Sequence, residues 1–209
     1  MDDEEQISTY HVIIKDSGPC ELREKASRFI SYAVRCKTQE EAESLLKVYR
    51  KKYFDATHLC YAFRLRTGIQ EYRRSSDDGE PSGTAGIPIM QEIIGKDLWN
   101  VLVMVIRYYG GTKLGTGGLV RAYGGNARMA LDEAEVAELE ITVTGTLFFP
   151  FSETGLVMQW LNRFHGVPEN QEYGPEGIVM TCSLPHKEVL HAGQALIDMS
   201  SGRLQWRKN

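Results

Sequence analysis

The most chemically suggestive stretch of the sequence is residues 77–88, DDGEPSGTAGIP, which places three carboxylates within four positions. Asp77, Asp78 and Glu80 could ligate a hard cation such as Mg²⁺, which takes one or two carboxylates and keeps waters for a phosphate-containing substrate. They could equally supply a general acid with a raised pKa. The same letters are ordinary turn chemistry at a helix start, with aspartate early and Pro81 fixing φ. Because no second carboxylate or histidine cluster of metal spacing accompanies them, the structural interpretation is favoured, and metal binding stays open.

A second suggestive stretch is residues 110–118, GGTKLGTGG, which fails both common phosphate-binding patterns. Leu114 follows Lys113 where a Walker loop needs Ser or Thr, and Val120 stands where a dinucleotide fingerprint needs its third glycine. The segment still leads from a strand into a helix N-terminus, whose N–H groups and partial positive charge suit a phosphate. Its candidate phosphate-contacting glycines are Gly115, Gly117 and Gly118. Spacing alone favours the alternative, in which these glycines serve only tight turns.

Cations around this glycine segment form a local basic cluster. Its members are Arg107, Lys113, Arg121 and Arg128. On a helix, Arg121, Gly125 and Arg128 share one face, so two guanidinium groups would flank bare backbone that a phosphodiester or another protein could approach. The alternative is close helix packing, with the arginines solvated or paired to Asp132. The cluster is the predicted nucleic-acid or phosphate site.

His58 and Cys60 alternate onto one face of a predicted strand, which raises the possibility of a thiol nucleophile with a histidine base. Neighbouring positions of one strand rarely supply the required geometry, and a free cysteine is usually a small buried hydrophobe. No catalytic residue is therefore predicted.

Composition bounds the class of protein. The chain has 209 residues, of which 42% are hydrophobic and 25% charged, and this is ordinary for a globular protein. A net charge of −4 argues against coating of nucleic acid by bulk attraction, so any such binding needs a local patch. The acidic start and four scattered cysteines indicate a reduced, cytoplasmic protein. The longest apolar run, residues 101–106, has the length of a buried strand, so no membrane role is expected.

Hydrophobic periodicity predicts the elements that must position these residues. In the first part of the chain, strands are expected at 9–16, 27–36, 57–66, 70–76 and 100–109, with a turn at 17–19 and a connection through Gly68. Helices are expected at 38–53, from about 87 to 94 with capping by Thr84 or a neighbour, and from about 119 to 134. The remainder alternates as βαββαβ, the split pattern of ferredoxin-like domains. The sequence thus predicts an α+β protein with domains at residues 1–138 and 139–209.

Three stretches together resemble the IMPACT family, whose bacterial members include the YigZ proteins. They are DATHLCYAFRL at 55–65, SSDDGEPSGTAGIPIM at 75–90 and VIRYYGGTKLGTGGLVRAYG at 105–124. The similarity spans about residues 8–136, and the tail resembles the second domain of bacterial members. Leu59 and Tyr109 depart from the usual Asn and Phe, and Leu59 puts a polar role for that strand position in doubt.

The resemblance implies a fold and a cellular setting. The family's N-terminal domain is similar to the second domain of a small-subunit ribosomal protein and to domain IV of the translocase EF-G, and its tail is similar to another, ferredoxin-like, domain of EF-G. Both likenesses point to RNA or the translation machinery by analogy of fold. Eukaryotic Impact proteins regulate translation by competing for a partner of a stress kinase. They carry an added N-terminal domain that is not recognised in this sequence, so kinase regulation is not transferred.

Three hypotheses follow. The favoured one is a cytoplasmic, non-enzymatic protein associated with translation, which contacts RNA, the ribosome or a translation factor through the basic cluster. The second is a metal-dependent enzyme acting on a nucleotide or another phosphate-containing substrate, with Asp77, Asp78 and Glu80 as ligands or acid–base groups. The third is a protein-interaction adaptor. No cofactor is predicted, and the sequence does not specify an oligomeric state.

Overall fold

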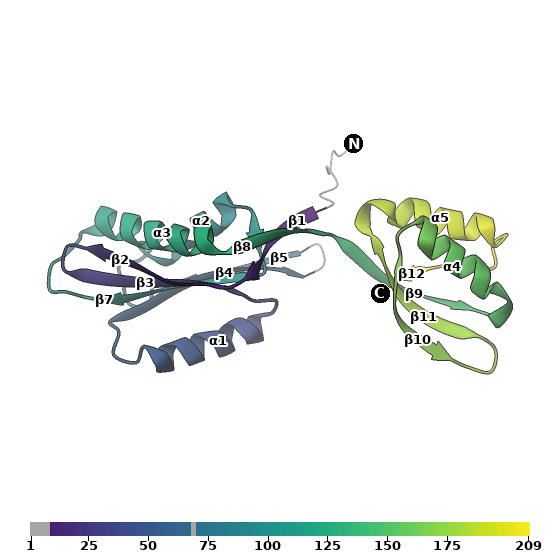
Figure 1. Ribbon diagram of the computed structural model, residues 1–209, viewed down its shortest axis with the longest axis horizontal. Helices are drawn as coiled ribbons and strands as arrows, with labels where there is room; N and C mark the ends of the chain where they lie inside the picture. Colours follow the sequence, from purple (N-terminus) through teal and green to yellow (C-terminus); the bar gives the residue numbers. More distant parts are fainter. Residues whose placement is uncertain (1–8, 68–69) are drawn as a thin grey trace. The chain divides into compact units, whose positions relative to one another are not determined.

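The computed structural model describes residues 9–67 and 70–209 (Figure 1). It divides into two compact units, residues 10–139 and residues 140–209, and each unit combines helices with β-sheet. The predicted boundary after residue 138 falls inside strand β8 (Glu135–Glu140). The predicted connection through Gly68 lies outside the described residues.

The first unit is built on a five-stranded antiparallel sheet. Its strand order is β2-β3-β7-β4-β5. The bounds are β2 (Ser17–Glu24), β3 (Ser27–Arg35), β4 (His58–Thr67), β5 (Gln70–Ser76) and β7 (Val101–Tyr108). Strand β7 is central and buried on both faces, as its unbroken apolar run predicts.

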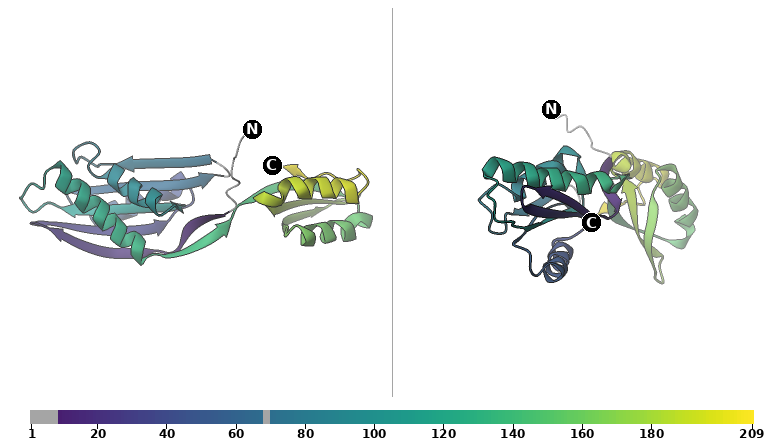
Figure 2. Two further views of the ribbon diagram at one scale, coloured as in Figure 1. Left: turned by 90° about the horizontal axis from the view of Figure 1, so that it is seen from above. Right: turned by 60° about the vertical axis from the view of Figure 1, so that its left-hand side comes forward.

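Helices cover both faces of this sheet. Helices α2 (Gly86–Gly95) and α3 (Thr116–Glu133) lie on one face, and α1 (Gln39–Lys52) lies on the other (Figures 1 and 2). Because side chains alternate along a strand, the odd-numbered residues of β7 join the core under α2 and α3, and the even-numbered ones join the core under α1. The predicted helix after Thr38 is confirmed, since the Thr38 side chain accepts a hydrogen bond from Glu41 N.

A small second sheet and one irregular strand start complete this unit. Strands β6 (Leu98–Trp99), β1 (Thr9–Lys15) and β8 lie side by side in that order. The turn predicted at residues 17–19 is wrong, because these residues begin β2 and Ser17 pairs with Ala33. The glycine and proline there produce a shift of register between Ser17 and Cys20 rather than a reversal of the chain.

The second unit has the predicted element order. It runs β9 (Thr142–Phe149), α4 (Thr154–Arg163), β10 (Val167–Tyr173), β11 (Ile178–Pro185), α5 (Val189–Met199) and β12 (Arg207–Lys208), with single 3₁₀ turns at Phe151–Glu153 and His186–Glu188. The antiparallel sheet has the order β10-β11-β9-β12. Its core includes Trp160 of α4, whose indole N–H donates to Ala192 O of α5 at 2.7 Å. No helix in the described part of the chain is both long enough and apolar enough to cross a membrane.

Candidate functional site

Asp77 closes the N-terminus of α2. Its carboxylate accepts hydrogen bonds from the backbone N–H groups of Gly83, Ala85 and Gly86 at 2.8, 2.9 and 2.8 Å. Burial opposes ionisation of this carboxyl, but the three backbone donors outweigh it, and the pKa of Asp77 is lowered. The predicted helix start is therefore present, but the residue that accepts from its N–H groups is Asp77, nine positions before the first residue of the helix. Thr84 takes no part in it, because its hydroxyl donates to Pro81 O within the loop.

Asp78 fastens the loop to its neighbours. One carboxylate oxygen accepts from Leu59 N of β4 at 2.6 Å, and the other accepts from Arg50 Nη2 of α1 at 2.7 Å. The polar contact at position 59 is thus made by the backbone, while the Leu59 side chain lies in the core under α1. This contact does not require the asparagine that is usual in the family.

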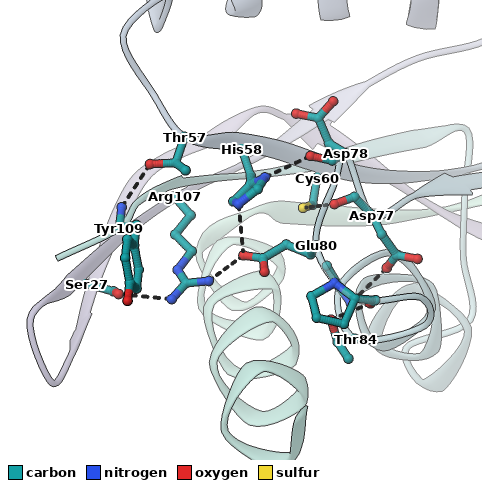
Figure 3. Close-up of polar contacts among 12 residues, drawn as sticks. Ser27, Thr57, His58, Cys60, Asp77, Asp78, Glu80, Thr84, Arg107 and Tyr109 are labelled. Carbon is teal, nitrogen blue, oxygen red and sulfur yellow. Dashed lines mark hydrogen bonds and ion pairs between the residues drawn. The ribbon is translucent and has the colours of Figure 1, made fainter. Parts of the chain in front are cut away.

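Glu80 is the centre of a buried polar network (Figure 3). Its Oε1 accepts hydrogen bonds from Arg107 Nη1 at 2.5 Å and Tyr123 Oη at 2.7 Å, and His58 Nε2 lies 3.7 Å away. Burial raises the pKa of Tyr123, so its hydroxyl remains a donor. Arg107 Nη2 donates to Ser27 Oγ at 3.1 Å, so the pair is held between β3, β7 and α3.

The three carboxylates therefore have three separate partners: the start of α2, the Arg50–Leu59 region and Arg107. Within residues 9–67 and 70–209, no three His, Cys, Asp or Glu side chains gather to hold a metal ion. Cys60 also serves the loop, because its thiol donates to Asp77 O at 3.0 Å. Burial raises the pKa of Cys60 to about 12, so the thiol is protonated at neutral pH.

The glycine segment leads from β7 to α3, which begins at Thr116 rather than near Leu119 as predicted. Position 110 requires a glycine because the backbone of Ala26 lies so close that a Cβ there would be 1.8 Å from Ala26 O. Gly115 occupies the N-cap position with φ of 74°. Among the described residues, no side chain caps this helix start, and its first turn carries no acidic residue. The first-turn N–H groups of α3 are therefore left to solvent or a ligand.

Cations surround this open helix start. Lys113 is exposed, and Lys25 Nζ lies 3.2 Å from Lys113 O. A Cβ built on Gly117 would lie 3.6 Å from Arg121 Nη1, so the Arg121 guanidinium also lies beside the first turn. A helix N-terminus already carries partial positive charge, so cations here are unfavourable until an anion binds. We call Lys25, Lys113 and Arg121 the α3 cation cluster.

The predicted basic cluster is only partly gathered at this helix start. Arg107 is 4% exposed and pairs with Glu80, whereas Lys113 and Arg121 are exposed. Arg128 forms a two-pronged ion pair with Glu92 of α2, and these hydrogen bonds raise the pKa of Arg128. The alternative of close helix packing is not observed at Gly125, because a Cβ there would meet nothing within 4 Å. The approach of a phosphodiester or another protein to this bare backbone stays a prediction.

We call residues 77–85, between β5 and α2, the acidic loop. One hollow of about 440 Å³ lies where the acidic loop meets the glycine segment, residues 110–118. Glu80 and Pro81 line it from the loop, and Lys113 lines it from the glycine segment. The other lining residues are Thr57, His58, Arg107, Tyr109, Leu114, Gly115, Thr116 and Leu119. The two stretches singled out in the sequence, separated by more than twenty residues, thus line one hollow.

Sequence reasoning missed several residues of this site. Lys25 precedes Lys113 by 88 positions, and no local pattern links them. Tyr123 lies within the helix expected at about 119 to 134 but shows no local sign of a polar role, and Tyr109 stands out only as a departure from the family. No local signal could have found them, because the antiparallel pairing of β4 with β7, which places His58 opposite Arg107, is decided by the tertiary structure.

Both stretches lie in the part of the chain that matches a known protein family. The pattern of the Impact N-terminal domain matches residues 25–131, which include both. An IMPACT family member of Thermus thermophilus is 41% identical over 179 residues, which is 85% of this chain and 96% of that protein. The chain belongs to the IMPACT family.

Two further matches extend beyond the N-terminal domain. The family member YigZ of Escherichia coli is 32% identical over 182 residues, covering 87% of this chain and 89% of that protein. A crystal structure of a hypothetical protein superposes with a TM-score of 0.72 at 29% identity, covering 96% of this chain and 97% of that one. The IMPACT-family chain therefore shares both of its units with known relatives.

Proposed function

We propose that this IMPACT-family protein is a translation-associated regulator that binds RNA through the start of α3 and the hollow beside it. The observation that carries the proposal is an uncapped helix N-terminus, among the residues described, surrounded by the α3 cation cluster. The regulatory setting rests on the family, whose eukaryotic members regulate translation.

Phosphate chemistry fits this surface. Backbone N–H groups at a helix N-terminus bind an anion directly, and the helix dipole adds to the attraction. Lys113 and Arg121 supply two flexible cations beside those groups. Since the whole chain carries a net charge of −4, this local excess of positive charge singles out one face for a polyanion.

An aromatic surface beside the phosphate position favours RNA over other polyanions. Tyr109 is 43% exposed and lines the same hollow as Lys113. Exposed aromatic rings next to a positively charged groove are the usual platform for unstacked bases. A ribosome presents such bases in its loops, so ribosomal RNA is the first target to test.

The test is co-sedimentation with ribosomes over a graded series of salt concentrations. The variant K113E/R121E is expected to weaken association about tenfold or more at low salt. Its salt dependence should also flatten by about 0.7 to 0.9 units of log–log slope for each phosphate that the variant no longer binds. K47E/K51E is the matched control with two charge reversals, because Lys47 and Lys51 are exposed lysines of α1, on the opposite face of the sheet. Unchanged association of the double variant would refute the proposal.

The other hypotheses receive less support. Asp77, Asp78 and Glu80 are engaged by backbone, Arg50 and Arg107, so no observation favours the metal-dependent enzyme. An adaptor role would appear as a protein partner that stays bound at salt concentrations that release RNA.

We further propose that residues 139–209 form a ferredoxin-like domain, a name supported by the βαββαβ order and the sheet order β10-β11-β9-β12. Residues 1–138 are proposed to share the fold of the ribosomal-protein second domain and EF-G domain IV, on the family resemblance. A cytoplasmic location is proposed from the reduced state of the four free cysteines.

A further inference from the structure

The hollow has the size of a small-ligand site rather than of a duplex groove. Its volume is about 440 Å³, within the range of roughly 300 to 1,000 Å³ typical of sites that enclose one small molecule. A double helix presents its phosphates on a convex surface and cannot place a base inside such a hollow. A single unpaired nucleotide can enter it.

One side of the hollow is suited to a phosphate. Gly115 and Thr116 belong to the start of α3, and Lys113 stands beside them. Thr116 lies at the first helical position, where the backbone N–H has no intrahelical acceptor. This side therefore offers backbone donors and a lysine to the same anion.

Another lining residue carries an unused donor. Arg107 Nη1 and Nη2 are held by Glu80 and Ser27, while Nε is buried and has no hydrogen-bond partner in the described structure. The Arg107 side chain is only 5% exposed. A buried N–H without an acceptor is unfavourable, so a ligand that brings a carbonyl, ring nitrogen or hydroxyl oxygen gains by supplying one.

Apolar contact makes up much of the remaining wall. Leu114, Leu119 and Pro81 line the hollow together with the ring of Tyr109. The Arg107 guanidinium carbon lies 5.2 Å from the centre of the Tyr109 ring, so the ring lies beside the guanidinium group. A flat heteroaromatic group with acceptors on its edge matches this combination, whereas inorganic phosphate or a simple sugar phosphate leaves the apolar wall uncovered.

We propose that the hollow binds one unpaired nucleotide of an RNA, with its phosphate at the start of α3 and its base on Tyr109. This inference rests on the proposed function and narrows it to a single-stranded element. A nucleoside monophosphate is the shared chemical unit, whether it comes from an RNA or is free in solution. The RNA source is the one proposed, because Arg121 and Lys25 extend the cationic surface around the same helix start.

The test measures binding of adenosine and uridine 5′-monophosphates, the matching nucleosides, inorganic phosphate, a single-stranded hexaribonucleotide and an RNA duplex of equal length. We expect each monophosphate to bind at least about tenfold more tightly than its nucleoside or inorganic phosphate. The hexanucleotide should bind more tightly than either monophosphate and than the duplex. Equal affinity for single strand and duplex, or for monophosphate and inorganic phosphate, would overturn the inference.

Variants of Tyr109 test the contact with the base separately from the contact with the phosphate. Tyr109→Leu should weaken binding of the hexanucleotide about tenfold while leaving that of inorganic phosphate unchanged, and Tyr109→Phe should restore binding. Tyr173→Leu is the control, because Tyr173 is an exposed tyrosine of the second unit. Thermal melting checks that each variant is folded.

The two proposals fail in different ways. If ribosome association depends on Lys113 and Arg121 but Tyr109→Leu has no effect on single-stranded RNA, the nucleotide inference fails and the proposed function stands. If free monophosphates bind while neither ribosomes nor the hexanucleotide do, both the RNA source and the proposed function fail.

Discussion

Helices α2 and α3 pack on the same face of one sheet, and both follow a loop rich in glycine, but their N-termini differ. At α2, the Asp77 carboxylate accepts from three backbone N–H groups, so the helix end is satisfied by the protein itself. At α3, no side chain of the described chain plays that part, and cations gather instead. The loop before α2 carries three carboxylates and the loop before α3 carries none. The position of Asp77 therefore satisfies the first helix start, while the N–H groups of the second are left to solvent or a ligand.

Glu80 connects the two regions. It lies in the loop before α2, yet its hydrogen bonds go to Arg107 at the end of β7 and Tyr123 of α3. Burial of a charge is tolerated only when it is paired and hydrogen-bonded. The pair therefore holds the acidic loop against the end of β7, just before the glycine segment, and both partners line the hollow.

The largest expected loss of stability comes from breaking the buried Glu80–Arg107 pair. Glu80→Ala leaves the Arg107 guanidinium buried without its counter-charge and should lower the free energy of unfolding by about 3 to 5 kcal/mol. Urea denaturation at neutral pH measures the loss. Glu24→Ala is the control, because Glu24 is exposed on β2 and should change stability by less than about 0.5 kcal/mol. A loss below about 1 kcal/mol at Glu80 would contradict the connecting role.

A smaller loss of stability is expected when the carboxylate that caps α2 is removed. Asp77→Ala removes the acceptor of three partly buried N–H groups and should cost about 2 to 3 kcal/mol. Thr116→Ala, at the start of α3, should cost less than about 0.5 kcal/mol, because its side chain caps nothing. Equal losses in the two variants, measured by urea denaturation, would erase the distinction between the helix starts.

The contribution of Asp77 should also depend on pH. The pKa of Asp77 is lowered in the folded protein, so its stabilisation is complete above the unfolded pKa of about 3.9 and is lost as pH falls through the folded pKa. The stability difference between the wild type and Asp77→Ala should stay constant from about pH 7 to 5 and shrink by about pH 3. Urea titrations at each pH measure it, and a difference unchanged at pH 3 would count against an ionised cap.

The smallest change in stability is expected from a new carboxylate at the start of α3, which should affect stability and RNA binding in opposite directions. Thr116→Asp places a carboxylate at the start of α3, as at α2, and should stabilise the protein by about 0.3 to 1 kcal/mol through the helix dipole. The same charge should repel RNA and weaken ribosome association. Thr116→Asn is the uncharged control of equal size. If Thr116→Asp left association intact, the α3 start would not be the phosphate site.

Sequence alone determined most of the elements and much of their order, but it did not predict β2, β6 or β8. Periodic apolar residues predicted α1, the unbroken apolar run predicted a buried β7, and the tail was predicted as βαββαβ. Each of these signals lies within one segment, where neighbouring residues decide backbone preference and burial. The turn at residues 17–19 was wrong because pairing with β3 outweighed local turn chemistry.

Only the tertiary structure decided what the carboxylates do. Glu80 reaches Arg107 across 27 positions and Tyr123 across 43, while Asp78 reaches Arg50 across 28. Nothing local distinguishes these three acids, because each would serve a turn, a metal or an ion pair equally well. The choice depends on which strands pair and in which register, and antiparallel β4 and β7 bring His58 opposite Arg107 at the edge of the hollow.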